Sequence, residues 1–338
     1  MATSVVGLRI RELLAQYPEA PSAQLARIAR QKWPEVFLSP EQARTAIRRL
    51  RGAQGEQNRR QQLGQTPRPA DDVETCRQWG ALLPRPEPTK WYEFALPATV
   101  DRWLALFDLH IPYYDEAALR AAVEHGRAQG CKGVLLGGDC FDFYRLSRWE
   151  QDPTTRRTSE EITDGRAVIR AIDAALEPDE FLFKIGNHDW RFERYIMGRA
   201  PELFGVPRIT LEAAMEAAEL GLTVVPSMSP IRHGKLSIMH GHEFPTGLTN
   251  PVNPARGAFL RAISCVVVGH HHRSSSHTEP THDGNDITCW SVGCLCDLRP
   301  IYRPVANKWN HGFAIIETPR DGASWRVHNY RIVNGEVV

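Results

Sequence analysis

The chain has 338 residues, of which 42% are hydrophobic and 24% charged, and its formal net charge is +1. These values are typical of a soluble globular protein with room for one large and one small domain. No apolar run reaches the roughly 18 residues of a membrane span, and the N-terminal apolar stretch is too short for a signal peptide. Seven cysteines without a disulfide-like framework suit a reducing compartment, so we expect a cytoplasmic protein.

The small net charge conceals an uneven distribution along the chain. Of the 41 basic and 40 acidic residues, 11 and 5 fall within residues 1–63, which leaves 30 and 35 for the rest. A basic head on a mildly acidic body predicts an anionic partner for the head. We therefore expect nucleic acid as a partner and no membrane, and the sequence indicates no obligate protein partner.

Residues 1–52 are predicted to form a small domain of three short helices. The first spans Val5–Gln16, and the second runs to about Lys32 from Ser22, which we expect to cap it. The segment Ser39-Pro40-Glu41-Gln42 starts the third, with a capping Ser, Pro at the first helical position and Gln three residues after the cap.

The third helix carries a basic face opposite its apolar residues. The members of this face are Arg44, Arg48, Arg49 and Arg51. Three short helices with a basic third one resemble a helix-turn-helix module, in which Arg48 and Arg49 would contact nucleic-acid phosphates. The alternative is a helical module that docks onto protein and whose charged face is simply solvated.

Residues 53–95 are predicted to link this head to the next domain. Their first part is rich in Gln, Gly and Arg and lacks apolar periodicity, as flexible linkers do. A short helix carrying Trp79 is expected over residues 73–83, and Pro84, Pro86 and Pro88 then extend the chain.

In residues 96–338, strand-like and helix-like patterns alternate first and strands dominate later, which predicts an α/β domain. The expected amphipathic helices cover residues 115–129, 159–176 and 253–263, and the late strands cover residues 287–292, 311–317 and 325–332.

Five apolar runs of this domain are followed by Asp, Asn or His. The runs and their followers are Trp103–Phe107 with Asp108-Leu109-His110, Val134–Leu136 with Gly137-Gly138-Asp139, Phe181–Ile185 with Gly186-Asn187-His188-Asp189, Leu236–Met239 with His240-Gly241-His242, and Cys265–Val268 with Gly269-His270-His271-His272. In open α/β sheets, sites lie outside the carboxyl ends of the strands, so these ends predict one metal site. Carboxylates, an amide oxygen and imidazoles suit Mn²⁺, which we favour, or Fe, Zn²⁺ or Ni²⁺.

The five motifs, in this order, resemble those of the calcineurin-like metallophosphoesterases. The resemblance runs from about residue 100 to residue 272, and with the helical head it extends to phage-encoded phosphoesterases, which would act in the host cytoplasm. The catalytic motifs alone are also similar to those of the nuclease subunit of double-strand-break repair complexes. The family's fold is a pair of packed mixed β-sheets flanked by helices, so we expect it here beside a small N-terminal all-helical domain.

The resemblance also implies a site for two divalent cations. The residues implied for the first are Asp108, His110, Asp139 and His272, and for the second Asp139, Asn187, His240 and His270. Asp139 would then bridge the two cations, and a water between them would have a lowered pKa and supply hydroxide near neutrality. His188 resembles the family's non-ligand histidine, which donates a proton to the leaving oxygen. Asp189 is expected to hold the other ring nitrogen of His188.

Several neighbouring residues have alternative interpretations. His188 is otherwise a ligand or a structural residue, and His242 competes with His240, although the family uses the first histidine of that pair. Asp142 is expected to hydrogen-bond its turn rather than to bind metal. The pair Cys294-x-Cys296 is interpreted as packing, because no second cysteine pair accompanies it.

The absence of two arginines that related phosphatases carry narrows the class of substrate that we expect. Protein Ser/Thr phosphatases of this superfamily place one arginine directly before GNH and another after GDxxD, where this chain has Ile185 and Phe143. Fewer fixed cations favour a phosphodiester, which carries one charge where a monoester carries nearly two. The arginines near the motifs are candidates for phosphate contact, with a solvated surface position as the alternative for each: Arg145, Arg191, Arg194 and Arg273. Residues 244–256 are expected to form a loop over the site.

The sequence therefore predicts a dimetal-dependent phosphodiesterase, in the first instance a nuclease acting on DNA. One alternative is a small-molecule phosphatase or cyclic-nucleotide phosphodiesterase whose head binds protein. Another is a DNA-binding regulator with an inactive enzyme domain, which is disfavoured because every expected ligand is present.

Overall fold

The computed structural model describes residues 5–52, 83, 85–87, 91–149, 152, 154–245, 252–300, 305, 307–319 and 324–338. The chain divides into two compact units, Met1–Pro88 and Thr89–Val338. The expected linker helix with Trp79 and the middle of the expected loop at residues 244–256 lie outside the described residues. Within the described part, no helix combines the length and the apolar character needed to cross a membrane.

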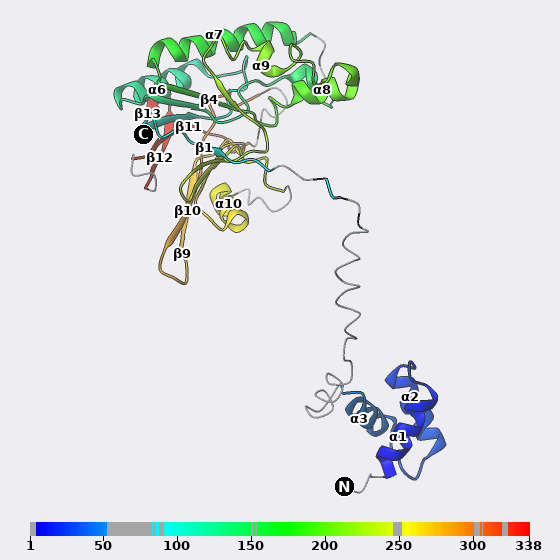
Figure 1. The fold of residues 1–338 in the computed structure, drawn as a ribbon. Helices are drawn as coiled ribbons and strands as arrows, with labels where there is room; N and C mark the ends of the chain where they lie inside the picture. Colours follow the sequence, from blue (N-terminus) through cyan, green and yellow to red (C-terminus); the bar gives the residue numbers. More distant parts are fainter. Residues whose placement is uncertain are drawn as a thin grey trace. The chain divides into compact units, whose positions relative to one another are not determined.

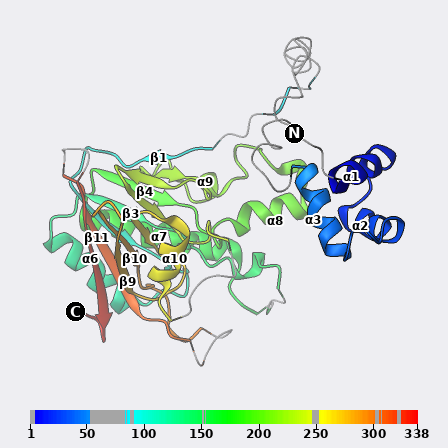
Figure 2. The same ribbon diagram turned by 90° about the horizontal axis from the view of Figure 1, so that it is seen from below.

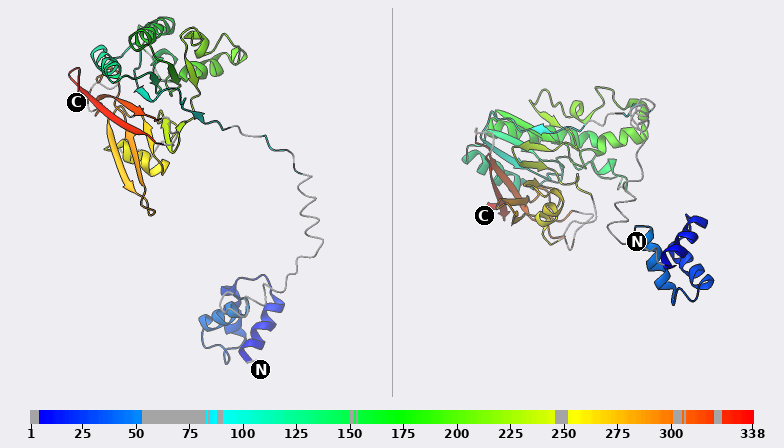
Figure 3. Two further views of the ribbon diagram at one scale, coloured as in Figure 1. Left: turned by 60° about the vertical axis from the view of Figure 1, so that its left-hand side comes forward. Right: turned by 60° about the horizontal axis from the view of Figure 1, so that its bottom comes forward.

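The N-terminal unit contains a bundle of three helices, as the sequence predicts (Figure 3). These are α1 (Val5–Gln16), α2 (Ser22–Lys32) and α3 (Pro40–Leu50). They enclose a small core whose fully buried side chains include Ile10, Leu25, Phe37 and Ile47. The start of α3 has the expected cap, since the Ser39 Oγ accepts a hydrogen bond from the Gln42 amide at 3.2 Å.

Two expectations for this bundle differ from the structure. Ser22 does not cap α2, because it lies inside the helix and its Oγ accepts a hydrogen bond from Arg51 Nη1 at 3.1 Å. Arg51 also donates to the carbonyls of Pro18 and Ala20, so it ties α3 to the α1–α2 turn instead of joining the basic face. Residues 33–39, between α2 and α3, are longer than the 3–4-residue turn of a helix-turn-helix.

The second unit contains a seven-stranded mixed sheet with the order β13-β12-β11-β2-β3-β4-β5. Strands β2 to β5 run parallel to one another, and β11, β12 and β13 add antiparallel pairs. The strand bounds are β2 (Arg102–Leu106), β3 (Gly133–Leu136), β4 (Glu180–Lys184), β5 (Thr223–Val225), β11 (His311–Glu317), β12 (Arg326–Val333) and β13 (Glu336–Val337).

A six-stranded mixed sheet faces it, with the order β1-β6-β7-β8-β10-β9. Its strands are β1 (Phe94–Ala95), β6 (Ile231–His233), β7 (Leu236–Met239), β8 (Val266–Val268), β9 (Ser275–Pro280) and β10 (Asp286–Ser291). The central strands β7, β8 and β10 are parallel neighbours, so the carboxyl ends of β7 and β8 lie at the same edge.

The alternation of side chains along β2 shows how the layers are held together. Trp103, Ala105 and Phe107 belong to the buried cluster between the two sheets, whereas Leu104 and Leu106 belong to the cluster beneath the helices. Those helices are α6 (Glu116–Ala128) and α7 (Thr158–Leu176), and α10 (Pro254–Ala262) covers the other sheet (Figures 1 and 2). Two packed mixed sheets flanked by helices are the fold that the sequence predicts.

Several short elements that follow β4 are not predicted from the sequence. They are α8 (Arg191–Arg199), the 3₁₀ turn η2 (Pro201–Leu203), α9 (Leu211–Ala214), β5 and β6. Each is short, and short elements give too few residues for a helical or alternating pattern to be distinguished. A second 3₁₀ turn, η1 (Tyr144–Leu146), follows β3 and lies near the site described below.

Candidate metal centre

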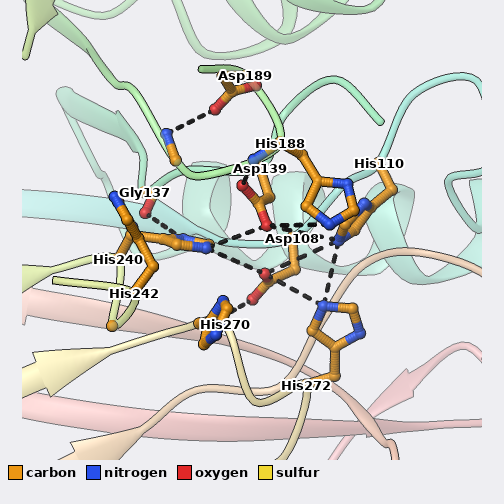
Figure 4. Close-up of polar contacts among 12 residues, drawn as sticks. Asp108, His110, Gly137, Asp139, His188, Asp189, His240, His242, His270 and His272 are labelled. Atoms are coloured by element: carbon orange, nitrogen blue, oxygen red, sulfur yellow. Dashed lines mark hydrogen bonds and ion pairs between the residues drawn. The ribbon is translucent and has the colours of Figure 1, made fainter. Parts of the chain in front are cut away.

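The carboxyl ends of strands from both sheets meet at one place (Figure 4). The seven-stranded sheet places Asp108 and His110 after β2, Asp139 after β3, and Asn187 and His188 after β4, and the six-stranded sheet places His240 after β7 and His270 and His272 after β8. Figure 4 labels all of these residues except Asn187, and the labelled histidines lie around the carboxylates of Asp108 and Asp139. The five sequence motifs therefore lie around one point.

Two groups of potential ligand atoms share a single carboxylate. One contains Asp108, His110 and Asp139, and the other contains Asp139, His240 and His270, with the ligand atoms of each group within 4.8 Å of one another. The His240 Nε2 lies 3.1 Å from Asp139 Oδ2. The position of Asp139 in both groups is the position that a bridging ligand needs.

Within the part of the chain that the structure describes, three buried polar atoms at this point form no hydrogen bond, although two of them lie close to an oppositely charged group. They are Asp108 Oδ1, Asn187 Oδ1 and His240 Nε2. Leaving a buried polar atom unpaired costs about 1–3 kcal/mol, so such atoms at one site call for an unseen partner. Carboxylate and amide oxygens together with imidazole nitrogens are suitable donors for divalent transition metals. The residues present therefore fit two divalent cations.

Two histidines of this cluster, His110 and His240, are oriented by hydrogen bonds at Nδ1. His240 Nδ1 lies 3.2 Å from the Gly137 carbonyl, and His110 Nδ1 lies 2.9 Å from Asp142 Oδ1. A ring whose Nδ1 donates to an oxygen presents its Nε2 as an unprotonated ligand. Both Nε2 atoms point toward the Asp108 and Asp139 carboxylates, at 3.1–4.0 Å.

The backbone at the strand ends adopts a conformation that side chains other than glycine rarely take. Asp108, His110, Asp139, His270 and His272 all have φ between 49° and 66°. Non-glycine residues in this left-handed region are uncommon and cluster at functional sites, where tertiary contacts enforce them. The backbone is therefore turned so that successive motif residues face the same centre.

The glycine before Asp139 is required by the closeness of the two sheets. Gly138 has φ +110°, and a Cβ at this position would lie 2.4 Å from His240 Nδ1. A side chain there would displace His240, which is why this motif has glycine directly before Asp139.

The carboxylates and imidazoles strongly perturb one another's pKa values. Burial disfavours protonated His240 and His272, but Asp139 and Asp108 respectively outweigh it and raise these pKa values to about 9 and about 10. Burial also disfavours ionised Asp108, yet His272, with its Nε2 3.2 Å from Asp108 Oδ1, helps lower its pKa to about 2. Burial and His240 lower the pKa of His270 to about 3. Since metals bind neutral imidazole, cations would compete with protons for His240 and His272.

His188 lies at the edge of this centre and is held by Asp142. Its Nδ1 is 3.0 Å from Asp142 Oδ1, the same oxygen that holds His110, and its Nε2 is 3.0 Å from Arg191 Nη2. Burial lowers the pKa of His188, although Asp139 opposes the effect. Because Arg191 only donates, His188 Nε2 accepts here, and a proton on Nε2 requires Arg191 to move away.

This arrangement corrects the expectations for Asp189 and Asp142. Asp189 does not hold His188, because its two carboxylate oxygens accept hydrogen bonds from the amides of Phe141 and Gly186, at 2.9 and 2.8 Å. Asp189 thus braces the turn, and burial raises its pKa to about 7. Asp142 was expected to brace its own turn, and it instead orients two histidines. The sequence does not indicate which of the two carboxylates orients His188 and which braces a turn, because both lie next to the same motifs.

Of the remaining expected site residues, some lie at the metal centre and others do not. Arg191 lines the cavity at the centre, whereas the Arg273 Nη2 donates to the Val252 carbonyl, away from the cavity lining. His242 Nε2 lies 2.8 Å from Ser227 Oγ and its Nδ1 lies 3.5 Å from Glu243 Oε2, and His242 belongs to none of the potential ligand groups among the described residues. Arg48 and Arg49 are exposed on α3 of the N-terminal unit.

Cys296 is closer to the centre than its interpretation as packing implies. Its Sγ lies 3.7 Å from His272 Nδ1, and it forms a further potential ligand group with His110 and His272. Both Cys294 and Cys296 are buried. A Cys-x-Cys without a second pair gave no indication of this placement.

A buried ion pair connects the two sheets beside the centre and was not expected from the sequence. Lys184, the last residue of β4, is 1% exposed, and its Nζ lies 3.0 Å from Glu243 Oε1. Glu243 in turn accepts hydrogen bonds from the amides of His240 and Gly241, at 3.1 and 2.6 Å. Lys184 outweighs the effect of burial and lowers the pKa of Glu243 to about 2. This pair therefore fixes the turn that carries His240.

No protein-family model matches this chain, and no curated protein matches it in sequence. Among solved structures, Vacuolar Protein Sorting 29 from Cryptosporidium parvum matches with a TM-score of 0.38 and 15% identity, over 71% of this chain and 95% of that one. Vps29 from Chaetomium thermophilum matches with a TM-score of 0.36 and 13% identity, over 70% and 95%.

Proposed function

We propose that this chain is a dimetal-dependent phosphodiesterase of the calcineurin-like type, and that its substrate is nucleic acid, in the first instance DNA. The observation that supports the proposal most strongly is the shared position of Asp139 in two ligand groups. A general acid candidate, His188, lies within 3.9 Å of Asp139, and Arg191 lies beside it. Paired cations, a proton donor and a fixed positive charge are the parts that phosphodiester hydrolysis uses.

The proposed roles follow from the position of each group. Two divalent cations, with Mn²⁺ favoured, would supply Lewis-acid activation of water and of the phosphoryl group. Asp108, Asp139 and Asn187 would hold them together with the histidines of both sheets. His188, oriented by Asp142, would protonate the leaving oxygen once Arg191 has moved from its Nε2 to the substrate phosphate.

The small number of arginines around the metal centre favours a phosphodiester substrate over a phosphomonoester. The positions where related phosphatases carry arginines hold Ile185 and Phe143, both of them buried and apolar. Among the described residues lining the cavity, Arg191 is the sole arginine. One fixed cation suits the single negative charge of a diester.

The test compares matched chromogenic substrates on the Mn²⁺-loaded protein. We expect faster hydrolysis of bis(p-nitrophenyl) phosphate than of p-nitrophenyl phosphate, followed by cleavage of single- or double-stranded DNA. Hydrolysis of the monoester alone would reject the phosphodiesterase and favour the small-molecule phosphatase.

We further propose that the basic face of α3 contacts nucleic-acid phosphates. Arg44, Arg48 and Arg49 are exposed on this helix, whereas Arg51 is not part of the face. Changing Arg48 and Arg49 to Gln in the full chain should lower the slope of log affinity against log salt by about 1 for each arginine–phosphate pair that is removed. Arg11→Gln, an exposed arginine on α1, is the matched control. An unchanged slope in the double variant would favour a head that binds protein.

A further inference from the structure

The cavity at the metal centre has an aromatic side that the proposed chemistry does not use. Its volume is about 370 Å³, and besides the polar residues of the centre it is lined by Tyr144, Trp149 and Trp309. Tyr144 and Trp149 come from the segment after β3, and Trp309 comes from the segment before β11. Aromatic rings from two separate parts of the chain thus line the same opening as His188 and Arg191.

Packing in a hydrophobic core does not explain the presence of a tryptophan at position 149. Its side chain is 70% exposed, so it contributes little to any core, although it lies beside a polar catalytic cavity. The Arg148 guanidinium lies 4.9 Å from its ring centroid, which adds positive charge next to the indole. An exposed indole beside a cation is a surface suited to a flat, electron-rich and partly anionic ligand.

Trp309 and Tyr144 are more firmly held than Trp149. The Trp309 ring packs against His272 at a centroid distance of 4.1 Å. The Tyr144 hydroxyl accepts a hydrogen bond from the Asp152 amide at 3.3 Å, which anchors the segment that carries Trp149. The aromatic side of the cavity is therefore built on fixed residues and ends in an exposed indole.

We propose that Trp149 and Trp309 are specificity residues that stack on a nucleobase next to the phosphate being cleaved. This inference rests on the proposed phosphodiesterase function and narrows its substrate to nucleotide-containing diesters. Bases stack on aromatic side chains with little dependence on sequence, because every base has a flat π face. The enzyme would then prefer a nucleoside on the phosphate without distinguishing strongly among bases.

The test uses two diesters with the same leaving group. Thymidine 5′-(p-nitrophenyl) phosphate carries a nucleoside where methyl p-nitrophenyl phosphate carries a methyl group, so the ratio of their kcat/KM values isolates recognition of the nucleoside. A stacked base contributes roughly 5- to 150-fold, and we expect the ratio in the unaltered enzyme to be at least about 5. Trp149→Ala should lower the ratio severalfold, with Trp309 accounting for what remains, and Trp149→Phe should restore most of the loss.

A matched control and a second variant guard against indirect effects. Trp91 is similarly exposed, at 67%, and does not line the cavity, so Trp91→Ala should leave the ratio unchanged. Trp309→Phe keeps an aromatic ring against His272 and should lower the ratio less than Trp149→Ala does. Metal content is measured for each variant, because Trp309 touches a candidate ligand.

Binding gives a readout that does not depend on turnover. Thymidine 5′-monophosphate should bind the full chain at least about fivefold more tightly than inorganic phosphate, and Trp149→Ala should reduce that difference. Equal affinity for the two ligands, or a ratio unaffected by Trp149→Ala, would overturn the aromatic contact while leaving phosphodiesterase activity intact. Absence of hydrolysis of both diesters would instead reject the proposed function, and the binding comparison would still decide whether the rings recognise a base.

Discussion

The two sheets contribute different chemistry to the same site. The seven-stranded sheet supplies both carboxylates, the Asn187 amide, His110 and the proton-donor candidate His188, whereas the six-stranded sheet supplies imidazoles alone. One ligand group, Asp108 with His110 and Asp139, lies entirely on the first sheet. The other takes Asp139 from the first sheet and two histidines from the second.

The two cation sites therefore depend differently on tertiary packing. Three of the four residues expected to hold the first cation, Asp108, His110 and Asp139, stay together as long as β2 and β3 remain paired, and only His272 comes from the second sheet. The second ligand group exists only while the two sheets are held in register by the apolar layer between them and by the Lys184–Glu243 pair. Damage between the sheets should therefore affect the second group more than the first.

The largest effect on rate is expected at His188. It belongs to the seven-stranded side but to neither ligand group that contains Asp139. His188→Ala should keep its metals and lose roughly 10²–10⁴-fold in rate on a diester with a poor leaving group. A nitrophenolate leaving group needs the proton less, so the deficit should be smaller there. Equal deficits on both substrates, or loss of a cation, would make His188 a ligand or a structural residue.

The next effect concerns the connection between the sheets. Lys184→Met leaves Glu243 buried and unpaired, and breaking a buried ion pair in this way costs about 3–5 kcal/mol. Urea denaturation measures the loss of stability, and Lys235→Met, at an exposed position of the β6–β7 turn, is the control. Since Glu243 holds the His240 turn, the variant should also lose one cation before the other. Equal weakening of both cations would contradict the proposed dependence on packing.

The smallest expected effect is on thermal stability and concerns Glu161, a buried carboxylate outside the metal centre. Glu161 on α7 accepts a hydrogen bond from the Phe143 amide, and burial raises its pKa to about 8 from an ordinary value of 4.5. The raised pKa stabilises the fold below about pH 4.5, and this stabilisation is lost as the pH rises through about 8. Glu161→Gln should remove that loss and raise the Tm at pH 8–9 by several degrees.

Thermal unfolding followed between pH 5 and pH 9 checks this prediction. The difference in Tm between the variant and the unaltered protein should grow with pH, while metal content stays the same. A constant difference would show that Glu161 does not titrate in this range.

The sequence predicted those parts of the fold in which one pattern decides the structure. The apolar run of β3 and the polar residues after it identify both a buried strand and its functional end, and the cap at Ser39 identifies the start of α3. The placement of all five motifs around one point follows from the same reasoning. Short elements such as β5 and α9 have no comparable pattern.

Side-chain partners across the tertiary structure could not be predicted in the same way. Asp142 and Asp189 both follow strand ends, and their roles are decided by which backbone amides and imidazoles lie within reach. Ser22 has the residue type of a helix cap, but in the structure its hydroxyl accepts a hydrogen bond from Arg51. Arg273 is close to the centre in sequence, yet its guanidinium reaches the Val252 carbonyl instead. In each case the outcome depends on residues distant in the chain.

The shared position of Asp139 is tested most directly by counting metal ions. After reconstitution with Mn²⁺ and removal of free metal, elemental analysis should find two ions per chain in the unaltered protein. Asp139→Asn should lose most of both, with a fall in affinity beyond the 10–100-fold typical of residues that only support a ligand. Asp173→Asn, an exposed acid on α7, should keep both ions. One ion or fewer in the unaltered protein, or two tightly held ions in Asp139→Asn, would contradict the dimetal centre.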